Sequence, residues 1–122
     1  MTFPLSRLMS SATAGYAVFA LAKPSHLGDA MGASITERSG YDLLAHTFGV
    51  RDLAISSFGF LGRSDRTVRT AMGIRILCDV GDGVLLSLRA GDSQTRTKVL
   101  GVTMSWAALN LLAVRTDARR AA

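Results

Sequence analysis

Four apolar stretches, each long enough to cross a lipid bilayer as an α-helix, constrain this chain more than any other feature. They cover about residues 5–22, 43–61, 68–88 and 98–114. A helix needs roughly 17–25 residues to cross about 30 Å of hydrocarbon. Only 19 % of the chain is charged, which is below the roughly 25 % of ordinary soluble domains. The pattern predicts one all-α domain over residues 1–122, an integral membrane four-helix bundle with up-down-up-down topology.

Two other interpretations of these stretches were weighed. A soluble four-helix protein should show a continuous charged stripe opposite the apolar face of each long helix. Residues 8–22 and 99–114 contain no charge at all, which favours the membrane interpretation. Residues 1–22 also resemble a secretory signal, with Arg7 ahead of an apolar core. We interpret this segment as a span.

The connections differ in length. Residues 23–42 form a long link in which Ser34 and Glu37 have capping-box spacing, so we expect a short interfacial helix to begin there. We expect His26, in the same link, to face solvent. The turns at 62–67 and 90–96 are short, and short links imply that sequential helices pack antiparallel.

Positive residues between the stretches and near their ends predict the orientation, because short cytoplasmic loops collect Lys and Arg. The side with both termini and the 62–67 turn carries seven of them: Arg7, Arg63, Arg66, Arg69, Arg115, Arg119 and Arg120. The opposite side carries five: Lys23, Arg38, Arg89, Arg96 and Lys98. The difference is small, and it favours a multi-pass protein of the cell membrane with both termini in the cytoplasm.

Five ionisable residues lie inside the second and third stretches. At 100° per residue, Arg75, Asp79 and Asp82 fall within about 60° of one another on a helix. Arg51 and Asp52 lie at the middle of the second stretch. A lone charge at the bilayer centre costs at least about 2.5–3.5 kcal/mol. We therefore expect these residues to turn inward and form Arg–Asp pairs.

The expected pairs do not balance, because two arginines face three aspartates. A protonated Asp, His46 or a bound cation could supply the difference. Asn110 lies on one face of the fourth stretch with Trp106, and we expect it to form a hydrogen bond across the bundle. The predicted polar cluster, with a structural or a binding role, is therefore Arg51, Asp52, Arg75, Asp79, Asp82 and Asn110.

The two middle stretches match each other at an offset of 24 residues. Gly49 aligns with Gly73 and Arg51 aligns with Arg75. Duplicated helices give repeats of this kind, and so does chance similarity between two apolar helices. The sequence does not separate these two origins.

Few motifs indicate chemistry. Asp79-Val-Gly-Asp82-Gly83 resembles the first half of the signature of CDP-alcohol phosphotransferases, but the rest of that signature is missing. The chain has one Cys and two His, so neither a disulfide framework nor a zinc site is expected. We expect no catalytic residue, no metal and no cofactor. The net charge of +5 comes without a contiguous basic face, so it indicates anionic lipid rather than nucleic acid.

The stretches FGVRDLAISSFGF and RTAMGIRILCDVGDGVLL carry a resemblance to a family. They look like a group of small four-span membrane proteins of bacteria and fungi, which is catalogued as a domain of unknown function. The resemblance covers about residues 5–115. It implies four spans and an inward polar cluster, and it implies no activity.

Three classes of function fit these predictions. The first is an accessory or binding subunit in the lipid bilayer, as a homo-oligomer or in a larger membrane complex. The second is a proton- or cation-coupled carrier of small molecules. The third is a membrane enzyme acting on a lipid-soluble substrate, which predicts a cavity beside the cluster. We rank them in that order, so a non-enzyme is favoured.

Overall fold

The computed structural model describes residues 2–122, and this part of the chain contains helices and no strand. The long helices are α1 (Pro4–Ala22), α3 (Ile35–Leu61), α4 (Asp65–Arg89) and α5 (Ser93–Ala121). A short helix, α2 (Ser25–Met31), lies between α1 and α3. The prediction of an all-α chain is confirmed, with five helices rather than four. Each predicted apolar stretch lies within one long helix.

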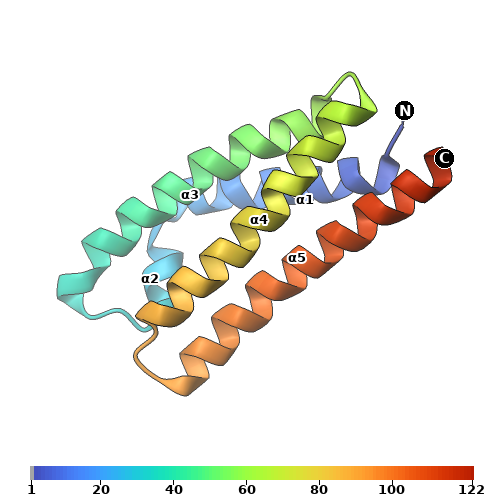
Figure 1. The fold of residues 1–122 in the computed structure, drawn as a ribbon. Coiled ribbons are helices and arrows are strands. Elements are labelled where there is room, and N and C mark those ends of the chain that lie inside the picture. The colour runs from blue at the N-terminus through green and yellow to red at the C-terminus, as the bar shows by residue number, and fades with distance from the viewer. Residues whose placement is uncertain (1) are drawn as a thin grey trace.

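The long helices pack side by side and form a closed ring of four. Helix α1 packs against α3 and α5, and α4 packs against the same two helices. Both termini and the α3–α4 turn lie at one end, which we call the terminal end, and α2 and the α4–α5 turn lie at the other (Figure 1). We call that second end the α2 end.

Local sequence signals set the ends of the first three helices. Helix α1 stops before Lys23-Pro24, because a proline disfavours helical geometry in the residue before it. Helix α2 ends at Gly32, whose φ of 63° is left-handed and suits glycine. The capping box of Ser34 and Glu37 then begins α3.

That capping box corrects one prediction. We expected it to start a short interfacial helix, but it starts the long helix α3, which has 27 residues. The chain between Ile35 and Leu61 contains no proline, so nothing interrupts the helix. The short helix lies earlier, at Ser25–Met31, where Gly32 ends it.

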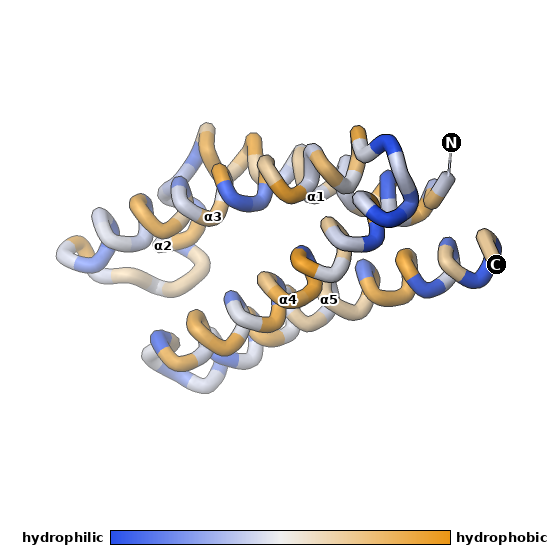
Figure 2. The backbone as a smooth tube through the Cα atoms, turned by 45° about the horizontal axis from the view of Figure 1, so that its top comes forward, coloured by the Kyte–Doolittle hydropathy of each residue, from blue (hydrophilic) through white to orange (hydrophobic). Residues whose placement is uncertain are grey.

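The bundle buries several polar side chains and exposes many large apolar ones. Of the six largest fully buried side chains, four are polar: Asn110, Asp117, Ser6 and Ser56. Twenty large hydrophobic residues are exposed, among them Leu77 and Leu88 on α4 and Leu112 on α5. Hydrophobic residues follow the middle of α4 and α5, and hydrophilic residues gather at the turns (Figure 2). Water-soluble domains seldom bury Arg and Asp side chains, whereas this bundle buries Arg75, Asp79 and Asp117.

Two apolar clusters close the ends of the interior. At the terminal end, Phe3, Val68, Met72 and Ala113 pack together. The cluster at the α2 end contains Leu27, Met31, Ala45, Leu86, Ala90 and Val99. On α4, Arg75 and Asp79 lie between these two clusters, so these two charged residues are at the middle of the bundle.

Candidate functional site

Arginine and aspartate side chains of α3 and α4 form one continuous network at the centre of the bundle. Arg51 donates to Asp82 through two nitrogens, at 2.9 and 2.6 Å, and also contacts Asp52 at 2.9 Å. Arg75 contacts Asp52 at 2.5 Å and donates to Asp79. We call these five residues the Arg–Asp network. The predicted inward pairing is confirmed, with each arginine bridging two carboxylates.

The helix geometry explains how these side chains meet. Arg75 and Asp79 are one turn apart on α4, so they share a face and pair directly. Arg51 is on α3 and points to a different side of that helix from Asp52. Its long side chain lies over the Phe48 ring, 4.6 Å from the centroid, and reaches Asp82. Side-chain length, rather than helix position, brings Arg51 into the network.

Asn110 joins the network from α5. Its amide nitrogen donates to the Trp106 carbonyl at 2.8 Å and to Asp79 Oδ2 at 3.4 Å. Asn110 is fully buried, and its Oδ1 atom has no hydrogen-bond partner. The predicted hydrogen bond across the bundle is present, although it is long.

The structure limits which groups can balance the negative charge of the three carboxylates. His46 is exposed on α3 and makes no contact with the network, so it does not supply the missing positive charge. Within residues 2–122 there is no group of three His, Cys, Asp or Glu side chains placed to hold a metal ion. With all three carboxylates ionised, the five-residue network therefore has a formal excess of one negative charge, and protonation of one Asp would remove it.

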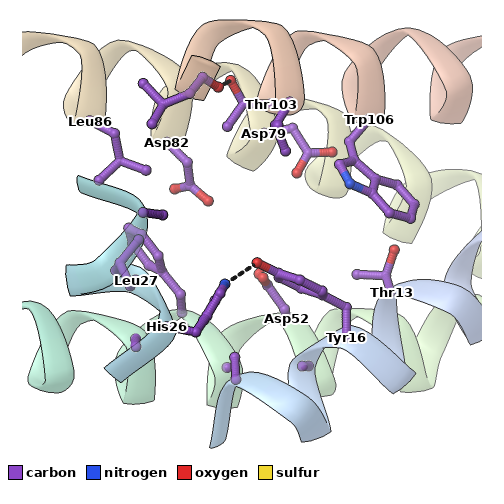
Figure 3. Close-up of a pocket in the computed structure, with 18 of the residues that line it drawn as sticks. Thr13, Tyr16, His26, Leu27, Asp52, Asp79, Asp82, Leu86, Thr103 and Trp106 are labelled. Atoms are coloured by element: carbon purple, nitrogen blue, oxygen red, sulfur yellow. Dashed lines mark hydrogen bonds between the residues drawn. The ribbon is translucent and has the colours of Figure 1, made fainter. Parts of the chain in front are cut away.

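A cavity of about 310 Å³ lies beside the network, and we call it the central cavity (Figure 3). All five helices contribute to its wall. Its polar lining residues include Asp52, Asp79, Asp82 and Arg75, and its apolar ones include Leu27, Leu86, Val99 and Trp106. Pockets for small molecules begin at about 300 Å³ and combine apolar walls with a few polar groups.

A tyrosine–histidine pair borders the central cavity toward α2, and we did not predict it. The Tyr16 hydroxyl and His26 Nε2 are joined by a hydrogen bond of 2.5 Å (Figure 3). His26 is half-buried rather than solvated, because α2 folds it back against α1. Partial burial lowers the pKa of the imidazole, and Lys23 acts in the same direction while Asp29 opposes it.

Two further polar residues are buried at the terminal end, outside the predicted cluster. Arg7 donates to the Phe60 and Gly62 carbonyls at 2.7 and 2.8 Å, and so caps the carboxyl end of α3. Asp117 accepts from the Ser6 amide at 2.7 Å at the amino end of α1. The sequence places Arg7 only among the N-terminal positive charges and gives no prediction for Asp117, because their partners are distant in sequence.

The matched residues of the two middle stretches have different surroundings. A methyl group on Gly49 would meet Leu21 of α1 at 2.8 Å, whereas one on Gly73 would meet no atom within 4 Å. Arg51 pairs with Asp82 and Arg75 pairs with Asp79. The sequence match therefore does not extend to equivalent packing.

One helix among residues 2–122, α5, is long and apolar enough by length and composition to cross a membrane. Only 22 % of its most apolar 18 residues are buried within the bundle, so most of this apolar segment is not enclosed by the other helices. Multi-pass membrane insertion, which requires three more spans, is thus not established by hydropathy.

Comparisons with known proteins add no relative. No family model matches the chain, and neither the curated proteins nor the solved structures contain a similar one. The resemblance to a four-span family therefore stays a prediction. The site must be judged from its own geometry.

Proposed function

We propose that this chain is an integral membrane protein with four spans, formed by α1, α3, α4 and α5. The supporting observation is that buried charged side chains occur together with many exposed apolar ones. Large exposed hydrophobic residues surround a buried interior that contains Arg75, Asp79 and Asn110. In lipid, that arrangement removes charges from hydrocarbon and exposes apolar side chains to it.

The low average hydropathy of α3 and α4 is compatible with this proposal. Helices α3 and α4 contain Arg51, Asp52, Arg75, Asp79 and Asp82. These residues lower a helix average, although their side chains lie between helices rather than toward the surroundings. A hydropathy average does not distinguish the inner from the outer face.

We place both termini in the cytoplasm. Four spans put the termini on one side, and both lie at the same end of the bundle (Figure 1). Arg7 is buried as a helix cap, so it no longer counts as a loop charge. The count of Lys and Arg outside the spans becomes six against five, and the direction of the difference is unchanged.

We further propose that the protein binds a small, mostly apolar molecule in the central cavity. The carrying observation is that Asp52, Asp79 and Asp82 all line this cavity. A network with a purely structural role would be sealed by side chains, because interiors are close-packed. An accessory or binding subunit fits this geometry best, because each of the three carboxylates on the cavity wall is already paired with a guanidinium group.

Membrane insertion is tested by extraction and labelling. The protein should remain in alkali-washed membranes, and in a Cys78→Ser background Ser64→Cys and Gly91→Cys should be labelled from opposite sides. A chain that is monodisperse without detergent would contradict the membrane proposal.

Ligand binding is tested with three probes of one shape: 1-adamantylammonium, 1-adamantanol and 1-adamantanecarboxylate. Trp106 is the only tryptophan and lines the central cavity, so its fluorescence should respond saturably to at least one probe. Ala20→Leu, which fills the cavity, should abolish the response. Ala54→Leu, on an exposed position of α3, is the matched control. Absence of a saturable response to all three probes would contradict the binding proposal.

A further inference from the structure

Hydrogen-bond acceptors outnumber donors at the wall of the central cavity. Arg51 directs Nε, Nη1 and Nη2 to carboxylates, and Arg75 directs Nε and Nη2 to Asp79. Asp52 Oδ2 accepts a hydrogen bond from no residue among 2–122, and Asp79 Oδ2 accepts only the 3.4 Å bond from Asn110. The wall therefore has free acceptors for a ligand that donates.

The electrostatics favour the same kind of ligand. The Arg–Asp network contains three carboxylates and two guanidinium groups. One positive charge placed among these carboxylates would neutralise the network without breaking any existing pair. Opposite charges within about 4 Å interact more strongly in a low-dielectric interior than in water.

Aromatic rings complete the wall around the carboxylates. Tyr16 and Trp106 line the same central cavity as Asp52 and Asp79 (Figure 3). The faces of such rings attract cations, and tryptophan does so most strongly. Leu27, Leu86 and Val99 provide an apolar surface toward the α2 end.

Lys98 is the one other cation on the cavity wall within residues 2–122, apart from Arg75. It lies in the second turn of α5 with an exposed side chain. Thr103 of α5 lies beside Gly83, next to Asp82, so Lys98 is more than one helical turn, about 5.4 Å, farther toward the α2 end. It forms no ion pair with the network, so it does not neutralise the carboxylates.

From these observations we infer that the ligand of the central cavity is a lipophilic ammonium ion. Its ammonium group binds between Asp52, Asp79 and Asp82, and its apolar body lies against Leu86 and Trp106. This inference rests on the proposed binding function and specifies the chemistry of its ligand. Arg75 Nη1 is buried and contacts Asp52 at 2.5 Å without hydrogen-bond geometry, so an anionic ligand at this guanidinium group is the competing possibility.

The three adamantane probes separate these possibilities, because they share one apolar body and differ in charge. With the purified full chain in detergent at pH 7.5, we expect 1-adamantylammonium to bind about tenfold more tightly than 1-adamantanol, and 1-adamantanecarboxylate to bind most weakly. Asp52→Asn should reduce the affinity for the ammonium probe by about tenfold, with little change for the alcohol.

A second variant keeps the test decisive if Asp52→Asn does not fold. Lys98→Gln removes a like charge from the cavity wall, so it should strengthen ammonium binding by roughly threefold and leave alcohol binding unchanged. Arg89→Gln removes an exposed charge near the same end, away from the cavity, and is the matched control.

Each outcome bears on one proposal. Equal affinity for the ammonium and the alcohol would overturn the inference of a cationic ligand, and would leave the binding proposal standing. Preference for the carboxylate would also overturn it, and would assign recognition to Arg75. Tight ammonium binding that neither Asp52→Asn nor Lys98→Gln alters would place the cation elsewhere.

Discussion

Asp117, near the end of α5, accepts a hydrogen bond of 2.7 Å from the backbone amide of Ser6 at the start of α1. The first amides of a helix have no partner within the helix. Phe3, the residue before α1, provides no side-chain cap. A carboxylate from the other end of the chain therefore satisfies the beginning of the first helix, and α1 and α5 are joined at the terminal end.

Removal of this cap should destabilise the whole bundle. Asp117 is 2 % exposed, and Asp117→Ala would leave the Ser6 amide buried without a partner. We expect a loss of about 1–3 kcal/mol in the free energy of unfolding, measured by thermal or chemical unfolding in detergent. Arg119→Ala, on an exposed position of the same helix, should change it by less than about 0.5 kcal/mol. Equal effects of both substitutions would show that the cap carries no stability.

The pair of Arg51 and Asp82 should show strong coupling. Either Arg51→Met or Asp82→Leu leaves a partly buried charge without its main partner, and breaking such a pair costs roughly 3–5 kcal/mol. The double substitution removes both charges and should cost less than the two single changes together. A double-mutant cycle of unfolding free energies measures the difference. If the effects simply add, the bidentate contact contributes nothing.

Sequence periodicity was sufficient to predict the four long helices and the inward direction of the charged residues. Two rules carried that prediction, the length of the apolar stretches and the high cost of an unpaired charge in hydrocarbon. The same rules placed Arg75, Asp79 and Asp82 on one face. They also predicted that Arg51 would find a carboxylate, although not which one.

The remaining features depend on contacts that helix periodicity does not encode. The Tyr16–His26 pair exists because α2 turns back onto α1, and the position of a seven-residue helix is set by packing. Asp117 and Ser6 are separated by 111 residues, so no local pattern connects them. The central cavity reflects the shape of side chains from all five helices.

Acidification should loosen α2. The pKa of His26 is lowered from 6.5 by burial, so the folded state favours the neutral imidazole. The contact with Tyr16 is therefore retained above about pH 6.5 and weakens as the pH falls through the lower folded-state value. Hydrogen exchange of the α2 amides should accelerate between pH 7.5 and pH 5, after correction for intrinsic rates. His26→Gln should remove this pH dependence, and an unchanged pH profile in that variant would assign the effect to another group.

The close approach of α1 and α3 at Ser10 depends on Gly59. A methyl group at this position would lie 2.9 Å from Cβ of Ser10, which is 5 % exposed and has little room to move. Gly59→Ala should therefore lower the free energy of unfolding by about 1–3 kcal/mol through overpacking. Gly73→Ala is the matched control, because the same methyl group would enter open space and should stabilise the helix by roughly 0.5–1 kcal/mol.

Adding Ser10→Gly to Gly59→Ala removes the obstructing side chain, so the double variant should be more stable than the sum of the two single changes predicts. If Gly59→Ala and Gly73→Ala have the same effect, then helix propensity, rather than the contact between α1 and α3, determines the response.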